Sequence, residues 1–360
     1  MTPAHTFVIA EAGVNHNGSV ERALELVDAA ARAGADAVKF QTFNAADMTS
    51  RYARKADYQM HSTCQRESQL EMLQKLELDL AAHERLTARC AQNGIQFLST
   101  PFDLSSLDML VNALGIQRIK IGSGEITNAP LLLRVAESGL PVILSTGMSS
   151  LGEIEEALGV MSFGYMHPGA PPSVAAFQQA YQSAQGQSRL REKLVLLHCT
   201  TEYPAPLADV NLRAIDTMAA AFGLPVGLSD HTVGFAAAIA GVARGASVIE
   251  KHLTVDRSLP GPDHKGSLEE NELAAMVKAI REVEVAIGTP RKMVTRSELK
   301  NRAVARKSLV ALKAIGAGEA FSMANLGVKR PGTGISPMRY WELLGVPANR
   351  EYAVDEVIVL

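Results

Sequence analysis

The stretch VGLSDHTVGFAAAIAGVARGASVIEKHLT, residues 226–254, decides the fold. It contains two short apolar runs that predict strands, and the segment between them is predicted to be a helix over 234–244. A histidine follows each run, His231 after Gly-Leu-Ser-Asp and His252 after Val-Ile-Glu-Lys. If the two strands are neighbours in a closed sheet, both imidazoles reach the same rim and could share a divalent metal ion.

Six earlier apolar runs also end in side chains that can do chemistry. In chain order they are followed by Glu11, by Lys39 and Gln41, by Thr100, by Lys120 and Ser123, by Ser145, and by His198. Eight such runs, alternating with amphipathic segments to about residue 285, predict an α/β fold of the (β/α)8 TIM-barrel type. In that fold the C-terminal ends of the strands carry the active site.

Helices are predicted near residues 19–33, 79–93, 104–114, 129–138, 150–161, 210–222, 234–244 and 268–286. Two of them begin with the sequence of a capping box, Ser150–Glu153 and Ser267–Glu270. Two connections are too long to be plain turns. Residues 41–78 follow the second strand and are expected to form a lid on the active rim. Residues 163–192 belong to the far rim, where we expect a structural insertion or a contact surface.

The length of 360 residues leaves room for a second domain, because one barrel takes roughly 250 residues. We predict a catalytic barrel over 1–286, a polar linker over 287–305 and a small β-rich domain over 306–360. Short strands are expected at 308–311 and 356–360. A domain of this size has a small core, which favours docking on another surface.

Composition excludes several classes of protein. The net charge of −3 and the pI near 6.3 give no basic surface for nucleic acid or an anionic membrane. Cys64, Cys90 and Cys199 have no CxxC spacing, which argues against a disulfide framework and a thiolate zinc site. The N-terminus lacks the pattern of a signal peptide, and no apolar run approaches ~18 residues. We therefore expect a cytoplasmic protein that is not inserted in a membrane.

The polar residues of strands two to five suit a phosphate group. Lysine supplies a compact positive charge and hydroxyls donate hydrogen bonds, which a phosphoanion needs in a barrel mouth. A lone lysine at a strand end is more often structural, but two lysines with interleaved hydroxyls favour a phosphate site. The turn at 122–125 lacks the third glycine of a dinucleotide fingerprint, and it could also be a plain βα turn. The set is Lys39, Thr100, Lys120, Ser123 and Ser145.

Three carboxylates are candidates for proton transfer or for binding hydroxyls. Burial at a barrel mouth can tune Glu11 and Glu125 toward neutrality, although a structural ion pair with a lysine is an alternative for each. Asp263 follows His252 closely and could bind substrate hydroxyls, or merely form a turn. Two neutral imidazoles suit Mn, Fe, Co, Ni or Zn and leave positions for water and a substrate oxygen. His198 could serve as a further ligand or as a hydrogen-bond group of the rim.

With these residues assembled, nearly the whole chain resembles the bacterial sialic acid synthase family. The motifs that carry the resemblance are AEAGVNHNG (10–18), VKFQT (38–42), STPFD (99–103), IGSGE (121–125), LSTG (144–147), HCTTEYP (198–204), SDHT (229–232), EKH (250–252), PGPD (260–263) and KRPGTG (329–334). The last of these resembles the family's antifreeze-like (SAF) C-terminal domain. The resemblance implies a transferase that condenses phosphoenolpyruvate with an N-acylated mannosamine-type sugar and releases phosphate.

The same resemblance implies a role for each candidate residue. It places Ser229 beside the phosphate-site residues as a phosphoenolpyruvate ligand and gives Mn, or else Mg or Co, to His231 and His252. Glu11 and Glu125 would handle protons. In a domain-swapped homodimer, Arg330 of one chain would reach the sugar bound in the other. The residues implied to bind the sugar are Gln41, Glu125, Tyr203, Asp263 and Arg330.

The amino-acid sequences of four segments suggest which acceptor sugar is used. Residues 67–72, 125–128, 198–206 and 262–265 look most like the N,N'-diacetyllegionaminic acid synthase branch, which implies 2,4-diacetamido-2,4,6-trideoxymannose as acceptor. N-acetylmannosamine, the acceptor of N-acetylneuraminate synthases, is the first alternative. Another phosphoenolpyruvate- or phosphate-dependent aldol condensation and a non-catalytic carbohydrate-binding barrel are the others. The insertion at 163–192 is longer than this family leads us to expect.

Overall fold

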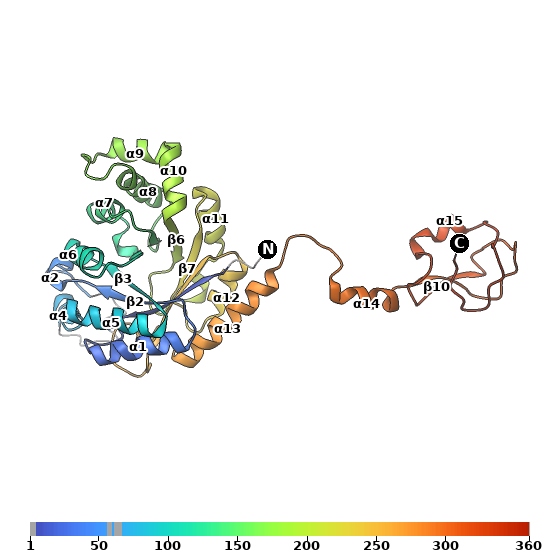
Figure 1. Cartoon of the computed structure of the whole chain (residues 1–360), viewed down its shortest axis with the longest axis horizontal. Coiled ribbons are helices and arrows are strands. Elements are labelled where there is room, and N and C mark those ends of the chain that lie inside the picture. The colour runs from blue at the N-terminus through green and yellow to red at the C-terminus, as the bar shows by residue number, and fades with distance from the viewer. Residues whose placement is uncertain (1–4, 56–59, 61–66, 360) are drawn as a thin grey trace. The chain divides into compact units, whose positions relative to one another are not determined.

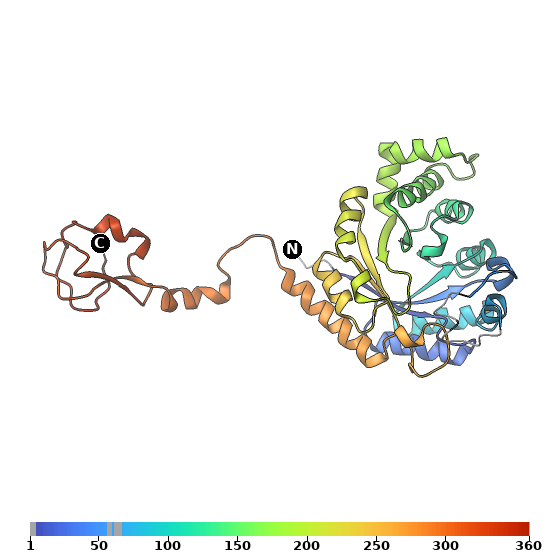
Figure 2. The same cartoon turned by 180° about the vertical axis from the view of Figure 1, so that it is seen from behind.

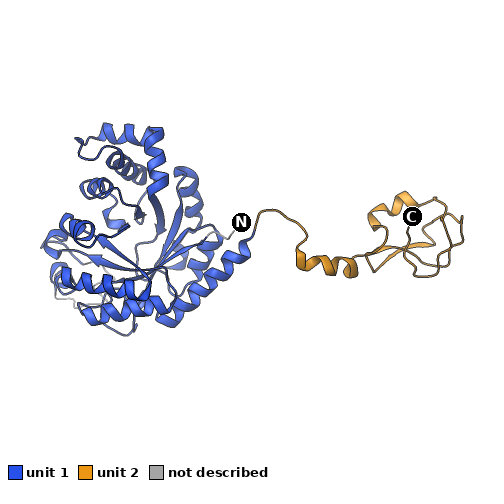
Figure 3. Cartoon of the chain, viewed as in Figure 1, with its two compact units in different colours: residues 1–288 blue, residues 289–360 orange. Residues whose placement is uncertain are grey.

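A computed structural model describes residues 5–55, 60 and 67–359 of the chain (Figures 1 and 2). The chain folds as two compact units, Met1–Gly288 and Thr289–Leu360, which Figure 3 shows in separate colours. Cys64, one of the three cysteines, lies outside the described residues. In the described part of the chain, no helix is long and apolar enough to cross a membrane.

The first unit contains eight parallel strands that curve into a nearly closed barrel (Figure 1). The hydrogen-bonded order is β3-β2-β1-β8-β7-β6-β5-β4, so the sheet runs round from β3 to β4. This arrangement confirms the predicted barrel, with β7 and β8 as neighbours. The strands are β1 Phe7–Gly13, β2 Ala37–Thr42, β3 Gln96–Pro101, β4 Ile119–Ile121, β5 Val142–Ser145, β6 Leu194–Cys199, β7 Val226–Asp230 and β8 Val248–His252.

Helices surround this sheet and follow the predicted ranges to within a few residues at most ends (Figure 2). The helix predicted at 104–114 divides into α6 and a π-helical turn, Met109–Ala113. The helix predicted at 210–222 starts later, because a 3₁₀ turn, Leu207–Asp209, precedes it. The main helices are α1 Val20–Arg32, α5 Leu80–Asn93, α6 Leu104–Asp108, α7 Ala129–Glu137, α8 Leu151–Met166, α11 Arg213–Phe222, α12 Ala236–Ala243 and α13 Glu270–Ile287.

One predicted capping box is confirmed and the other is wrong. Ser150 and Glu153 cap α8 reciprocally, as expected. At α13 the box uses Glu269 and Glu272 instead of Ser267 and Glu270. The hydroxyl of Ser267 is engaged elsewhere: it donates to the Asp263 carbonyl at 2.7 Å and accepts from the Asn15 amide at 2.9 Å. Contacts distant in sequence therefore override the local capping signal.

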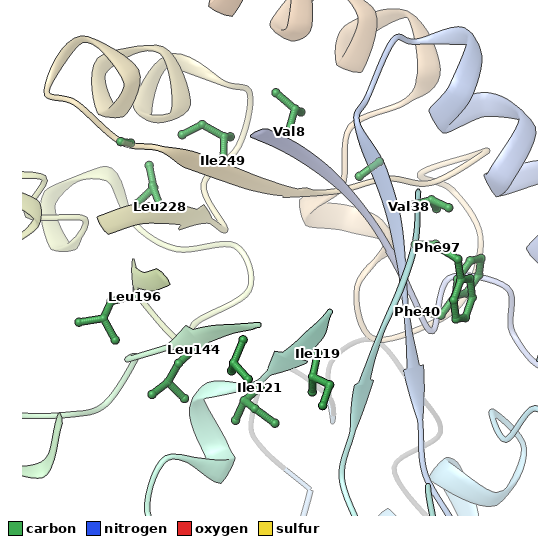
Figure 4. Close-up of a cluster of buried hydrophobic side chains, with 14 of the residues drawn as sticks. Val8, Val38, Phe40, Phe97, Ile119, Ile121, Leu144, Leu196, Leu228 and Ile249 are labelled. Carbon is green, nitrogen blue, oxygen red and sulfur yellow. The ribbon is translucent and has the colours of Figure 1, made fainter. Parts of the chain in front are cut away.

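Alternation along the strands divides their side chains between two layers. Outward-facing apolar residues from all eight strands pack under the helices (Figure 4). Inward-facing apolar residues form a separate cluster in the barrel interior, consisting of Ile9, Ala37, Leu98, Ile143, Leu197 and Val248. Because side chains alternate with a period of two, the next inward positions lie nearer the C-terminal ends, and there the residues are polar. The apolar cluster thus forms the floor of the site.

The two long connections are partly helical. The connection 41–78 contains α2, Ala45–Met48, and α4, Gln69–Gln74, and part of it lies outside the described residues. The insertion 163–192 contains the end of α8 and two further helices, α9, Val174–Gln182, and α10, Ala184–Lys193. Both of these helices pack against α8. The far-rim insertion is therefore a helical addition to the outer layer.

The second unit is small and has its own core. Its elements are α14, Arg296–Ala305, which lies within the expected linker, the antiparallel pair β9, Ser308–Ala311, and β10, Leu326–Lys329, and α15, Tyr340–Leu343. The prediction of a strand at 356–360 is wrong for the described residues 356–359, which form only an isolated bridge at Val357. The end of the chain divides its backbone hydrogen bonds between β9 and Ile335, so no continuous ladder forms.

Candidate active site

The inward-facing polar residues at the C-terminal ends of the strands line one cavity of about 220 Å³. Two residues beyond most apolar floor positions stands a polar side chain: Glu11 after Ile9, Lys39 after Ala37 and Glu250 after Val248. Strand register sets Glu11 level with Lys39 on β2 and with His252 on β8, whereas Glu250 pairs with Ile9 and Ser229. The cavity is lined by most of the predicted site residues, namely Glu11, Lys39, Gln41, Thr100, Lys120, Ser123, Ser145, Tyr203, Ser229, His231, His252 and Asp263.

Two lysines and two glutamates form a buried charged cluster at the base of this cavity. The Lys39 ammonium contacts the Glu11 carboxylate directly and lies 3.6 Å from that of Glu250. The Lys120 ammonium is 3.5 Å from the other Glu250 oxygen. All four side chains are at most 6% exposed, so each charge depends on its neighbours instead of water. Ser229 donates to Glu250 at 2.8 Å.

The environment moves the pKa values of the two glutamates in opposite directions. Burial raises the pKa of Glu11 to about 7, although Lys39 opposes this effect. Burial would also raise the pKa of Glu250, but Lys120 and Lys39 outweigh it and hold that pKa at about 2. Glu11 is therefore the carboxylate able to exchange a proton near neutral pH, and Glu250 is a permanent anion.

The hydroxyl groups surround the lysines. Lys39 donates to Thr100 Oγ1 at 3.2 Å, and Ser123 Oγ accepts from the Gly147 amide at 3.0 Å. Gly147 permits this close approach, since a Cβ there would lie 2.8 Å from Ser123 Oγ. Ser145 ends β5 and is 3% exposed. Cations and hydroxyls thus converge as the sequence predicted, in a form able to hold a phosphoanion.

The two histidines face each other beside this cluster, with ring centroids 5.6 Å apart. His231 Nδ1 lies 2.7 Å from the Thr200 carbonyl oxygen, which can only accept, so Nδ1 carries the proton and Nε2 presents a lone pair. His252 Nδ1 is buried with no hydrogen-bond partner, 3.9 Å from the Asp263 carboxylate. Burial lowers the pKa of His231 to about 4 and that of His252 well below its usual value. Both rings are neutral, as metal ligands must be.

These nitrogens fit a divalent metal held by two protein ligands. Within the described part of the chain, no group of three or more His, Cys, Asp or Glu side chains is placed to hold a metal ion. Any such ion would therefore keep several positions for water or substrate oxygens. His198 does not join His231 and His252, because its Nε2 lies 2.6 Å from the Val210 carbonyl oxygen. This contact agrees with the alternative prediction that His198 is a hydrogen-bonding group of the rim.

Three of the residues expected to bind sugar line the cavity and two do not. Gln41, Tyr203 and Asp263 are present, with the Tyr203 ring centroid 4.2 Å from that of His231. Glu125 ends a 3₁₀ turn, Ser123–Glu125, accepts from the Asn128 side-chain amide at 2.7 Å and is not among the residues that line the cavity. Arg330 belongs to the second unit and donates to the Ala305 carbonyl.

Glu250 is the main residue that the sequence-based prediction missed. It lies two positions before His252 on β8, so alternation alone places it on the inward face. That signal was present in the sequence, but a carboxylate is an unexpected member of a phosphate site. Its contacts with both lysines explain its presence: it neutralises them when no other anion is bound.

Comparison with known proteins agrees with this geometry. The sequence profile of the NeuB family matches residues 26–292. An N,N'-diacetyllegionaminic acid synthase from Campylobacter jejuni is 50% identical over 98% of this chain and 98% of its own length. Another from Legionella pneumophila is 44% identical over 94% of this chain and 89% of its own. A crystal structure of an N-acetylneuraminic acid synthetase from Leptospira borgpetersenii, 33% identical, superposes with a TM-score of 0.65 and covers 82% of this chain and 90% of that one.

Proposed function

Because this chain belongs to the NeuB family, we propose that it condenses phosphoenolpyruvate with 2,4-diacetamido-2,4,6-trideoxymannose. The products are N,N'-diacetyllegionaminic acid and inorganic phosphate. The observation that carries the proposal is the single cavity in which two buried lysines, several hydroxyls and two neutral histidines converge. The acceptor follows from the 50% and 44% identity to two synthases of that acid.

The lysine and hydroxyl groups hold phosphoenolpyruvate. Its phosphate and carboxylate groups pair with the ammonium groups of Lys39 on β2 and Lys120 on β4, which line the cavity. The hydroxyls supply the hydrogen bonds that the anion loses when it leaves water. They are those of Thr100, Ser123, Ser145 and Ser229.

His231 and His252 hold a divalent metal ion, with Mn preferred and Mg or Co as alternatives. The Nε2 lone pair of His231, which faces the Ser229 hydroxyl at 3.2 Å, and the unpartnered buried Nδ1 of His252 support this role. When bound, the metal polarises the aldehyde carbonyl of the acceptor. Asp263, whose pKa burial raises to about 6, lies next to this pair and is placed to bind a sugar hydroxyl.

In the reaction, the electron pair of the C2–C3 double bond of phosphoenolpyruvate forms a bond from C3 to the aldehyde carbon, and the aldehyde oxygen takes a proton from water to become a hydroxyl. Positive character then develops at C2, and water adds there as Glu11 accepts its proton. The resulting tetrahedral adduct loses phosphate by cleavage of the C2–O bond, leaving the 2-keto acid. A carboxylate with a pKa near 7 suits this proton transfer, and Glu11 is preferred to Glu125 because it lines the cavity.

The second unit completes the site in this proposal. Residues 306–360 form an antifreeze-like domain that covers the active site of the partner in a domain-swapped homodimer. Arg330, exposed on this unit, then contacts an acyl group of the sugar. Such an arrangement would give the small domain the surface that its limited core requires.

The chemistry is tested with phosphoenolpyruvate that carries ¹⁸O in the bridging C–O–P position. Cleavage of the C2–O bond puts the label into phosphate, whereas attack of water at phosphorus leaves it in the organic product. Label in phosphate, released only when the acceptor sugar is present, is the expected result. Unlabelled phosphate, or release without acceptor, would contradict the proposed reaction.

A further inference from the structure

One wall of the cavity is apolar, in contrast to its charged base. Its side chains belong to a single hydrophobic cluster, separate from both barrel cores and built from the β1–α1 loop, the connection 41–78 and the residue after β3. We call it the apolar wall. It consists of Val14, Met48, Met72, Leu73, Leu76 and Phe102.

The apolar wall is held in place by specific contacts. Helix α4 begins with a capping box formed by Ser68 and Glu71. The Glu77 carboxylate accepts from the Ala45 amide at 2.6 Å, which ties the end of the connection to α2. Gly18, in a left-handed conformation with φ +76°, lets the β1–α1 loop lie directly against the Lys75 carbonyl. The wall therefore presents a fixed surface.

The charged base determines which end of the acceptor faces this wall. In the proposed function, on which this inference rests, the aldehyde carbon must lie near the histidines and lysines, where phosphoenolpyruvate is bound. The far end of the acceptor, with its C4 acetamido group and C6 methyl group, is then left to the remaining lining. That lining includes the Gln69 side chain at the start of α4 and the apolar wall, and the side chains of the wall offer no hydrogen-bonding groups beyond weak thioether acceptors.

We propose that the apolar wall binds the C6 methyl and C4 acetamido methyl groups of the acceptor and so selects 6-deoxy sugars against 6-hydroxy sugars. A C6 hydroxyl would lose its hydrogen bonds to water at this surface without replacement. A hydrophobic pocket rejects an added hydroxyl only moderately, by up to about 10²-fold. We therefore expect a preference of roughly 10- to 100-fold in kcat/KM.

The test compares two acceptors that differ only at C6, 2,4-diacetamido-2,4,6-trideoxymannose and 2,4-diacetamido-2,4-dideoxymannose. The ratio of their kcat/KM values is measured by phosphate release with one enzyme preparation, so the fraction of active enzyme cancels. Met72→Gln, which adds hydrogen-bonding groups to the wall, should lower the ratio about tenfold or more. Met72→Leu keeps an apolar surface and should retain the wild-type ratio.

Met276→Gln is the matched control. Met276 is as buried as Met72 but lies in the barrel core and outside the cavity lining, so this variant should lose stability without changing the ratio. An unchanged ratio in Met72→Gln, or an equal fall in Met276→Gln, would overturn the role of the wall while leaving the proposed function intact. If the wild type released no phosphate with either sugar, the proposed function would fail and this inference with it.

Discussion

Removal of the charge of Glu250 should destabilise the free enzyme and strengthen its response to phosphate. The carboxylate lies 3.6 Å from the Lys39 ammonium and 3.5 Å from that of Lys120, and its side chain is 6% exposed. Lowering its pKa from 4.5 to about 2 corresponds to about 3 kcal/mol of stability at neutral pH. Loss of one member of a buried ion pair independently gives about 3–5 kcal/mol. Glu250→Gln keeps the shape of the side chain, so this loss is due to charge.

The assay is urea unfolding of wild type and Glu250→Gln, with and without saturating phosphate at pH 7. The variant should lose about 3 kcal/mol without phosphate, and phosphate should stabilise it more than the wild type, because the anion supplies the missing countercharge. Glu192→Gln is the control: its partner Arg189 and Glu192 itself are about half exposed, so the change should be under about 1 kcal/mol. A loss below about 1 kcal/mol in Glu250→Gln, or weaker stabilisation by phosphate, would refute the reasoning.

Four further predictions follow from the same geometry. Glu11→Gln should bind phosphoenolpyruvate in calorimetry but turn over about 10²- to 10⁴-fold more slowly; near-wild-type turnover would remove Glu11 from the proton transfer. His231→Ala and His252→Ala should each lose bound metal by elemental analysis, and stoichiometric Mn in both would contradict the assignment. Arg330→Ala mixed with Glu11→Gln should recover activity in mixed dimers if the second unit acts across subunits, and no recovery would favour action within one chain. Burial lowers the pKa of His16 from 6.5 to about 4, so the neutral ring contributes its full share to folding stability above pH 6.5 and this share is lost as the pH falls. Between pH 7 and 5 the free energy of unfolding of the wild type should therefore fall by about 2 kcal/mol more than that of His16→Gln. Parallel curves of stability against pH for the two proteins would contradict this prediction.

The barrel and most of its cavity were predictable because they depend on a strictly local rule. Side chains in a strand alternate with a period of two, so a polar residue two positions past an apolar floor residue must face inward, whatever the helices do. Lys39 and Thr100 were predicted because each follows a short apolar run, and in the structure both stand on this inward face. The same rule yields Glu250, which stands two positions past Val248 and contacts Lys120, whereas a choice based on the ends of apolar runs passes over it.

What the sequence could not supply are features that depend on long-range contacts or on tight turns. Ser267 has the sequence of a helix cap, but Asn15, distant in the chain, engages its hydroxyl. Glu125 follows a strand as the active residues do, yet a 3₁₀ turn directs it to Asn128. In the insertion 163–192, α10 has few apolar positions, and α9 is a short helix of nine residues, so their packing on α8 left little periodic signal.

The most direct test of the account is phosphate release from phosphoenolpyruvate in the presence of Mn, with 2,4-diacetamido-2,4,6-trideoxymannose and N-acetylmannosamine compared at matched concentrations. A much higher kcat/KM for the trideoxy sugar is predicted. A higher value for N-acetylmannosamine would make the chain an N-acetylneuraminate synthase instead, and release with neither sugar would contradict the proposed function as a whole.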